Sequence, residues 1–332
     1  MPRCSRLCFR NLCIKKKVFC MSFCETNTCP KINVTMKLHL FVLLGLLLFA
    51  IFVVWFAFYD EKKTLRFTPI KGAKLYGDDN GLFLPYPQVD WSSPTDKYND
   101  GIARFMFALS WNATSAKVTS RNVPVPPEFD TLVELKSKPW TSELQETYGI
   151  FLHSSGLGIS VISFGGTESY VDIYDDLSYS QVPPSAFNLS DSTVSVHSGF
   201  YGAYMDVRAQ LKELVQKHQG PLFMCGYSMG SGVLGVCALD FADNPELKMC
   251  ISFASPRVVN PAGSRYLSSV KYYRVANSED VVPYLPPPII SDIIDYGTTL
   301  YYEHIGENIV YTDNLLSVLN NHTVAYKNYM GF

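Results

Sequence analysis

The sequence predicts an α/β fold in which a mainly parallel β-sheet is covered by helices on both faces. Short apolar segments alternate with helical patterns from residue 148 to residue 276, and this alternation is typical of parallel sheets. A Gly-x-Ser-x-Gly motif lies where one predicted strand passes into a predicted helix. The chain has 332 residues and is 47% hydrophobic, which suits one large domain with appendages.

The predicted elements are set by apolar runs of strand length and by apolar residues at helical spacing. In chain order they are strands at 148–153 and 158–164, a helix at 201–218, a strand at 222–225, a helix at 229–242, and strands at 249–254 and 272–276. Gly220 is a natural C-cap for the first helix. Cys225 and Cys250 fall inside predicted strands, where a buried thiol acts as a small hydrophobe.

The chain is expected to have four parts. They are a basic, cysteine-rich tail at 1–37, a membrane segment at 38–59, a lead-in at 60–140 that packs on the catalytic domain, and the catalytic domain at 141–332. The lead-in is irregular and rich in proline and aromatic residues, with a helix expected near 100–111.

Charge and cysteine usage exclude two classes of protein. The net charge is −2 and no long basic stripe follows the first 37 residues, so a nucleic-acid partner is not expected. Six of the nine cysteines lie in the tail, so the large domain is not a disulfide scaffold. The tail cysteines match no zinc pattern, and acylation sites or a disordered tail both remain open.

The segment from Leu38 to Tyr59 contains no charged residue and is long enough, as a helix, to cross a bilayer. A cleaved signal peptide is the alternative, but the segment is too long and lacks a small-x-small cleavage site. We therefore expect an uncleaved signal anchor. The protein would be a single-pass membrane protein of the secretory pathway, or a secreted one if the segment is cleaved.

The orientation of this segment is not settled by charge, because basic residues flank it on both sides. Glycosylation acceptor tripeptides follow it at Asn112, Asn188 and Asn321, and one precedes it at Asn33. Such tripeptides are weak signals. Together they favour a catalytic domain that is lumenal or extracellular.

The motif Gly226-Tyr227-Ser228-Met229-Gly230 lies between a predicted strand and a predicted helix, which is the setting of a nucleophile elbow. Gly226 and Gly230 would avoid clashes in the tight turn while the Ser228 hydroxyl stands exposed. The helix N-terminus would present N–H groups to a developing oxyanion. Ser228 is therefore the candidate nucleophile.

A serine nucleophile needs a histidine base that is oriented by a carboxylate, and the chain order with this elbow is Ser, Asp, His. Only His304 and His322 follow Ser228. The candidate acids include Asp280, Asp292 and Asp295. Asp280 lies in a polar turn just beyond a predicted strand end, where an orienting acid belongs.

Several blocks between residues 148 and 329 resemble the class 3, or fungal-type, triacylglycerol lipases of the α/β-hydrolase superfamily. In order they read ISFGGTES, VHSGFYGAY, GYSMG, FASPRVVN, YRVANSEDVVPYLPP, YEHIGE and NHTVAY. The resemblance implies that Ser228 is the nucleophile, Asp280 the acid and His322 the base. It implies that His304 belongs to a block that is structural or near the site.

The resemblance also implies an oxyanion hole formed by Thr167 and the backbone N–H of Met229, and a lid over residues 168–177. Three positions depart from the usual pattern of the family. Gly165 stands where the family has arginine, Asn321 stands where aspartate commonly precedes the base, and Met224 and Cys225 replace branched aliphatic residues. None of these changes removes a reacting group.

The function implied is hydrolysis of lipid carboxylic esters, most directly acylglycerols, through an acyl-enzyme on Ser228. Two alternatives remain. The chain is a phospholipase or an esterase of non-glyceride esters, or it is a catalytically silent membrane-anchored protein that binds lipid. The expected partners are a lipid ester and the membrane. No cofactor, metal or protein partner is implied, and His197 is expected to make a packing hydrogen bond.

Overall fold

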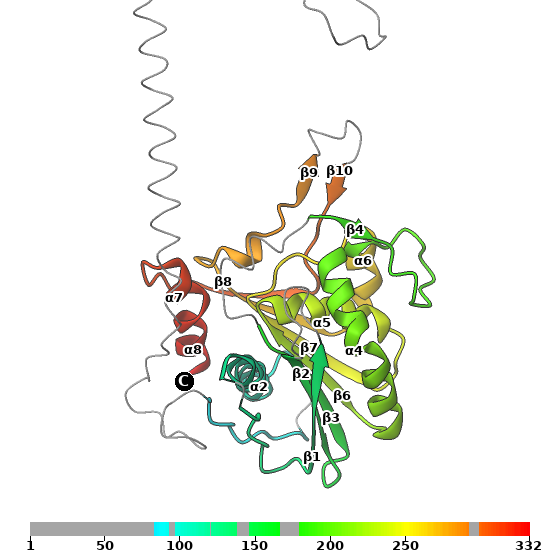
Figure 1. Ribbon diagram of the computed structural model, residues 1–332. Coiled ribbons are helices and arrows are strands. Elements are labelled where there is room, and N and C mark those ends of the chain that lie inside the picture. The colour runs from blue at the N-terminus through cyan, green and yellow to red at the C-terminus, as the bar shows by residue number, and fades with distance from the viewer. Residues whose placement is uncertain (1–82, 93–96, 120, 138–145, 167–178, 292–298) are drawn as a thin grey trace, which may run out of the picture. The chain divides into compact units, whose positions relative to one another are not determined.

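The computed structural model describes residues 83–92, 97–119, 121–137, 146–166, 179–291 and 299–332 (Figure 1). These residues belong to the compact unit that spans Thr64–Phe332. The predicted membrane segment, Leu38 to Tyr59, lies outside the described residues. Within the described ranges no helix has the length and apolar character needed to span a membrane.

A seven-stranded sheet forms the centre of the domain, in the order β1-β2-β3-β6-β7-β8-β11. Strand β2 pairs antiparallel with both β1 and β3, and the strands from β3 to β11 are parallel. The strands are β1 (Thr131–Ser137), β2 (Glu146–Ser154), β3 (Ile159–Phe164), β6 (Leu222–Tyr227), β7 (Leu247–Phe253), β8 (Tyr272–Asn277) and β11 (Glu307–Tyr311). The predicted mainly parallel sheet is confirmed.

Helices cover both faces of the sheet (Figure 1). Helix α2 (Asp100–Thr119) packs on one face, and α4 (Ser198–Lys217) and α5 (Met229–Asp240) pack on the other. Strands β3 and β6 are buried at every position, which explains why both are mainly apolar in the sequence rather than alternating. The core therefore has two apolar layers, one on each side of the sheet.

The remaining elements lie mostly around the carboxyl edge of the parallel strands. They are the ribbon of β4 (Gln181–Val182) and β5 (Val196–His197), α6 (Pro261–Tyr266), the short 3₁₀ helices η1 (Leu267–Ser269) and η2 (Val282–Tyr284), the ribbon of β9 (Ile289–Ser291) and β10 (Thr299–Tyr301), α7 (Val318–His322) and α8 (Val324–Met330). Helix α8 contacts α2, so the C-terminus of the chain closes the α2 face of the core.

Two features of the predicted lead-in differ from expectation. Its helix continues to Thr119 as α2, and β1 joins the central sheet by pairing with β2. The sheet therefore begins before residue 141. The lead-in supplies part of the core rather than a layer that packs on a completed domain.

The acceptor tripeptide at Asn112 cannot carry a glycan in the folded domain. Asn112 is fully buried in α2. Its side chain accepts a hydrogen bond from Leu84 N at 2.6 Å and donates one to Leu84 O at 2.9 Å. Asn321 is also buried, whereas Asn188 is exposed. The three tripeptides therefore do not jointly indicate a lumenal domain.

Candidate active site

The candidate nucleophile stands on a strained turn between β6 and α5. Ser228 has φ 56° and ψ −126°, a backbone conformation that costs a non-glycine residue about 1–3 kcal/mol. A Cβ on Gly226 would lie 2.5 Å from Gly230 O, and one on Gly230 would lie 2.4 Å from Phe164 O. Both glycines are therefore required by the close approach of backbone, as the motif predicts.

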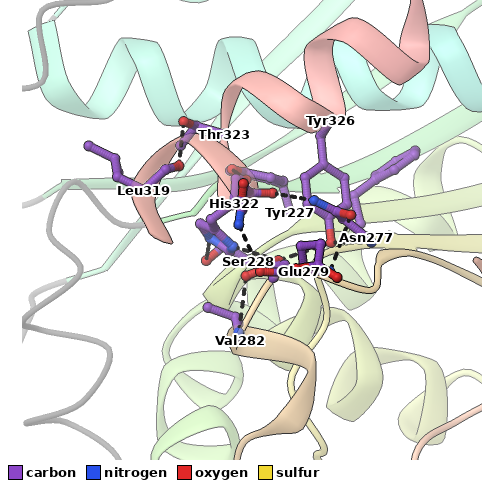
Figure 2. A network of polar contacts seen from close by, with 12 residues as sticks. Tyr227, Ser228, Asn277, Glu279, Val282, Leu319, His322, Thr323 and Tyr326 are labelled. Carbon is purple, nitrogen blue, oxygen red and sulfur yellow. Dashed lines mark hydrogen bonds and ion pairs between the residues drawn. The ribbon is translucent and has the colours of Figure 1, made fainter. Parts of the chain in front are cut away.

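Three side chains that are distant in sequence meet at this turn (Figure 2). The Nε2 atom of His322 lies 2.8 Å from Ser228 Oγ, and its Nδ1 atom lies 2.8 Å from Asp280 Oδ2. All three residues are buried. The imidazole thus bridges the alcohol and the carboxylate with hydrogen bonds on both ring nitrogens. The structure brings together the three residues that the sequence selects.

The topology explains this convergence. Ser228 follows the end of β6, Asp280 lies three residues after β8, and His322 ends α7, which follows β11. These strands are parallel, so their carboxyl ends share one edge of the sheet. Residues that follow different strands therefore meet there.

Asp280 is held by further donors besides the imidazole. The backbone N–H of Val282 donates to Oδ1 at 3.0 Å, and the Tyr326 hydroxyl donates to Oδ2 at 2.9 Å. Burial, together with the negative charge of Asp280, raises the pKa of Tyr326 well above its ordinary value. Tyr326 therefore stays neutral and remains a hydrogen-bond donor to the carboxylate.

Two asparagines join the loop of the acid to the helix of the base. The Asn277 amide donates to Asn321 O at 3.0 Å, and the Asn321 amide donates to Glu279 O at 3.1 Å. Asn321 Oδ1 also accepts from Leu315 N at 2.7 Å. An aspartate at position 321 could accept but could not donate to Glu279 O. This gives a structural reason for asparagine where the family commonly has aspartate.

Tyr227, the residue before the nucleophile, also contacts the base. Its hydroxyl donates to the backbone carbonyl of His322, and its ring stacks on the imidazole with centroids 5.3 Å apart and planes 29° apart. Tyr227 is buried. One side chain of the elbow therefore fixes both the backbone and the ring of the residue that would accept the serine proton.

The other histidines have different surroundings. His304 lies near Arg274 and Arg257, and burial followed by these charges lowers its pKa to about 3. His197 caps α4 by accepting from Gly199 N at 3.2 Å, and burial lowers its pKa to about 4. Among the described residues, neither of these histidines makes a hydrogen bond to Ser228. The alternative acids Asp292 and Asp295 lie outside the described residues.

Of the two residues expected to form the oxyanion hole, Met229 lies within the described residues. Met229 begins α5, so its backbone N–H lies at the helix N-terminus beside Ser228. Thr167 and the predicted lid at 168–177 lie outside the described residues. The backbone N–H of Gly166 donates a hydrogen bond to Thr114 Oγ1 at 2.7 Å. A Cβ added to Gly166 would lie 3.2 Å from Ser228 Cβ. The end of β3 is therefore fixed next to the nucleophile.

The chemistry available to this arrangement is nucleophilic attack by a serine. His322 can take the Ser228 proton, and Asp280 can orient the ring and stabilise the imidazolium that forms. Among the described residues, no group of three or more histidine, cysteine or acidic side chains could hold a metal ion. The chemistry described here uses only protein groups.

Residues 161–289 match the model of the class 3 lipase family. This part of the chain is therefore similar to the class 3 lipases. The match includes Ser228 and Asp280 and ends before His322. A lipase of Rhizomucor miehei is 30% identical over 189 residues, which are 53% of this chain and 48% of that protein. Lipase A of Sodiomyces alcalophilus is 27% identical over 162 residues, which are 38% of this chain and 39% of that protein.

The matched region thus spans less than half the length of these curated relatives. A solved structure of the Rhizomucor miehei lipase in complex with its propeptide is 20% identical. The structural alignment covers 64% of this chain and 68% of the Rhizomucor miehei chain, with a TM-score of 0.48.

Sequence reasoning selected the three residues of the triad but missed those that hold them. Tyr326, Asn277, Tyr227 and Thr114 were not singled out. Tyr326 had a usable signal, because it lies four residues after His322 in a helical pattern and so shares its face. Thr114 had none, because it comes from α2, 52 positions before the residue whose N–H it holds.

Proposed function

We propose that this protein hydrolyses carboxylic esters of lipids through an acyl-enzyme on Ser228. His322 removes the hydroxyl proton as Ser228 attacks the ester carbonyl, and then gives that proton to the leaving alcohol. A water molecule, activated by the same imidazole, releases the fatty acid. Asp280 keeps the ring oriented throughout. The observation that carries the proposal is the pair of 2.8 Å contacts on the two nitrogens of His322.

An oxyanion hole made by Met229 N–H and by Thr167 is part of the proposal. Its support is the position of Met229 at the start of α5 and the position of Gly166 beside Ser228. The helix N-terminus adds favourable electrostatic potential at the same point. Removing one such donor typically lowers the rate by about 100-fold or more.

The substrate class is proposed to be acylglycerol. The support is the match of residues 161–289 to the class 3 lipase model, together with the name "lipase" that the Rhizomucor miehei and Sodiomyces alcalophilus proteins carry. Phospholipids and non-glyceride esters are the alternative substrates. We further propose that Leu38 to Tyr59 attaches the protein to a membrane of the secretory pathway, on the strength of its uninterrupted apolar composition.

The proposal is tested with the full chain in detergent. Fatty-acid release is measured on emulsified long-chain triglyceride, on phospholipid vesicles and on a soluble short-chain ester, with Ser228→Ala as the control. We expect release from the triglyceride emulsion that falls by at least about 1000-fold in the variant. Lipid binding without release from any of the three substrates would instead support the silent binding protein. Faster release from the phospholipid vesicles or from the soluble ester would show that the preferred substrate is a phospholipid or a non-glyceride ester and not an acylglycerol.

A further inference from the structure

A group of buried polar side chains lies apart from the triad, on the α5 face of the sheet. Its centre is Arg274 in β8, which is 8% exposed. Ser252 in β7 is the register partner of Arg274, and Tyr272 lies two residues before it, so all three side chains share one face of the sheet. Arg274 Nε, Ser252 Oγ and Tyr272 OH are buried without a hydrogen bond of ordinary geometry, although the Ser252 hydroxyl lies close enough to Tyr272 OH to lower its pKa against the larger effect of burial.

Among the described residues, a second arginine adds positive charge beside this group. Arg257 lies close by, and its guanidinium donates to the carbonyls of Tyr284 and Pro286 at 2.6 and 2.8 Å. Burial lowers the pKa of Arg274, and the nearby charge of Arg257 lowers it further. No carboxylate among the described residues forms an ion pair with either arginine.

The segment that carries His304 covers the group from the side of β11. The glycine of this segment, Gly306, packs against Tyr272 so closely that an added Cβ would lie 2.1 Å from Tyr272 O. The Nδ1 atom of His304 is buried without a hydrogen bond. The imidazole of His304 is therefore another buried polar group near Arg274, and its low pKa keeps it uncharged at neutral pH.

A buried guanidinium without a counter-charge is costly, because the charge loses its hydration and gains no compensating partner. A hydrogen bond between the neighbouring hydroxyls of Ser252 and Tyr272 would still leave Arg274 Nε unpaired. A water molecule would satisfy hydrogen bonds but would not balance the charge. A small anion would do both.

We propose that this cluster binds a small monovalent anion such as chloride, with Arg274 as the cationic ligand and the hydroxyls of Tyr272 and Ser252 as donors. Both hydroxyls can turn their hydrogens toward one acceptor. The donor atoms are buried, which favours a halide over a larger oxyanion. Because Arg257 donates to the carbonyls of Tyr284, the last residue of η2, and of Pro286, the anion also braces the turn that leads away from Asp280. The proposal rests on packing and charge and does not depend on esterase activity.

The test is the thermal unfolding of the full chain in detergent, in sodium chloride and in sodium gluconate at equal ionic strength. We expect a saturable rise in Tm of about 2 to 4 °C that is specific to chloride. Arg274→Met abolishes the chloride-specific rise, and Arg265→Met, which changes an exposed arginine of α6, preserves it. If Arg274→Met does not fold, Tyr272→Phe replaces it, and the chloride concentration at half-saturation should rise by about fivefold or more.

Bromide gives an independent position for the anion. In crystals grown with sodium bromide, an anomalous peak is expected beside Arg274 Nε. Equal Tm values in chloride and gluconate would overturn the proposal, because no anion would then be bound specifically. An anomalous map without bromide at Arg274, where a water molecule refines instead, would overturn it as well.

Discussion

At the scale of single residues, the geometry around Asp280 depends on buried groups that do not react. The carboxylate is contacted by His322, by the Tyr326 hydroxyl and by Val282 N–H. The Tyr326 hydroxyl in turn accepts from Asn277 N at 3.0 Å. Loss of this hydroxyl therefore leaves Asn277 N without its acceptor and removes one of the three donors to Asp280, which is costly in the interior.

Tyr326→Phe is expected to lower kcat by about ten- to a hundredfold with little change in KM. The reason is the loss of a charge-assisted hydrogen bond worth about 1.5 to 3 kcal/mol, which orients the acid and touches no substrate. The measurement is kcat and KM on a soluble ester. Tyr329→Phe is the matched control, since Tyr329 is partly exposed and stacks on Tyr311. Equal kcat and KM values for the two variants would show that Tyr326 does not position Asp280.

At the scale of elements, the turn between β6 and α5 places the hydroxyl of Ser228 for reaction. The turn lets Ser228 adopt a positive φ only because glycines lie on both sides of it. Gly230→Ala should lower kcat/KM by about 100-fold or more, because a Cβ 2.4 Å from Phe164 O must displace the nucleophile. Gly156→Ala serves as control, since nothing lies within 4 Å of a Cβ there. Unchanged kinetics in Gly230→Ala would contradict the steric account.

The N-terminus of α4 makes the fold sensitive to acid. The pKa of His197 is about 4 in the folded protein because burial disfavours the cation, and about 6.5 when the chain is unfolded. The unfolded state therefore binds more protons between these values, and stability falls as the pH drops from 6.5 to 4. The loss from this group is at most about 1.4 kcal/mol per pH unit.

His197→Asn keeps a capping acceptor and removes this titration, so its stability should fall less steeply with acid. The free energy of unfolding, measured in denaturant at several values from pH 4 to 7.5, tests this. His304 contributes a slope of the same sign in both proteins, because its pKa is lowered to about 3. Parallel curves for wild type and variant would show that His197 does not titrate in this window.

At the scale of the whole molecule, the sequence predicted the parallel strands and the order of the triad, because both leave local signals. Mainly apolar runs mark β3 and β6, and a motif marks the turn at Ser228. The roles of β1 and α2 were missed. Their place in the core follows from pairing with β2 and from packing between distant segments, which no local pattern encodes. The burial of Asn112 was missed for the same reason.

The proposed membrane attachment concerns the part of the chain before the described domain. Deletion of residues 1–59 should move the protein from the carbonate-resistant membrane fraction to the supernatant, because the apolar span of Leu38 to Tyr59 is removed. Hydrolysis of a soluble ester should persist, since the described fold and triad lie after residue 82. A full-length chain that alkaline carbonate extracts from membranes would contradict the anchor.

The central claim is that His322 activates Ser228. Reaction of the full chain with a fluorophosphonate, followed by peptide mapping, tests it most directly. The account predicts a single adduct on Ser228, formed at least about 1000-fold more slowly in His322→Ala. An adduct on another serine, or a labelling rate that His322→Ala leaves unchanged, would contradict it.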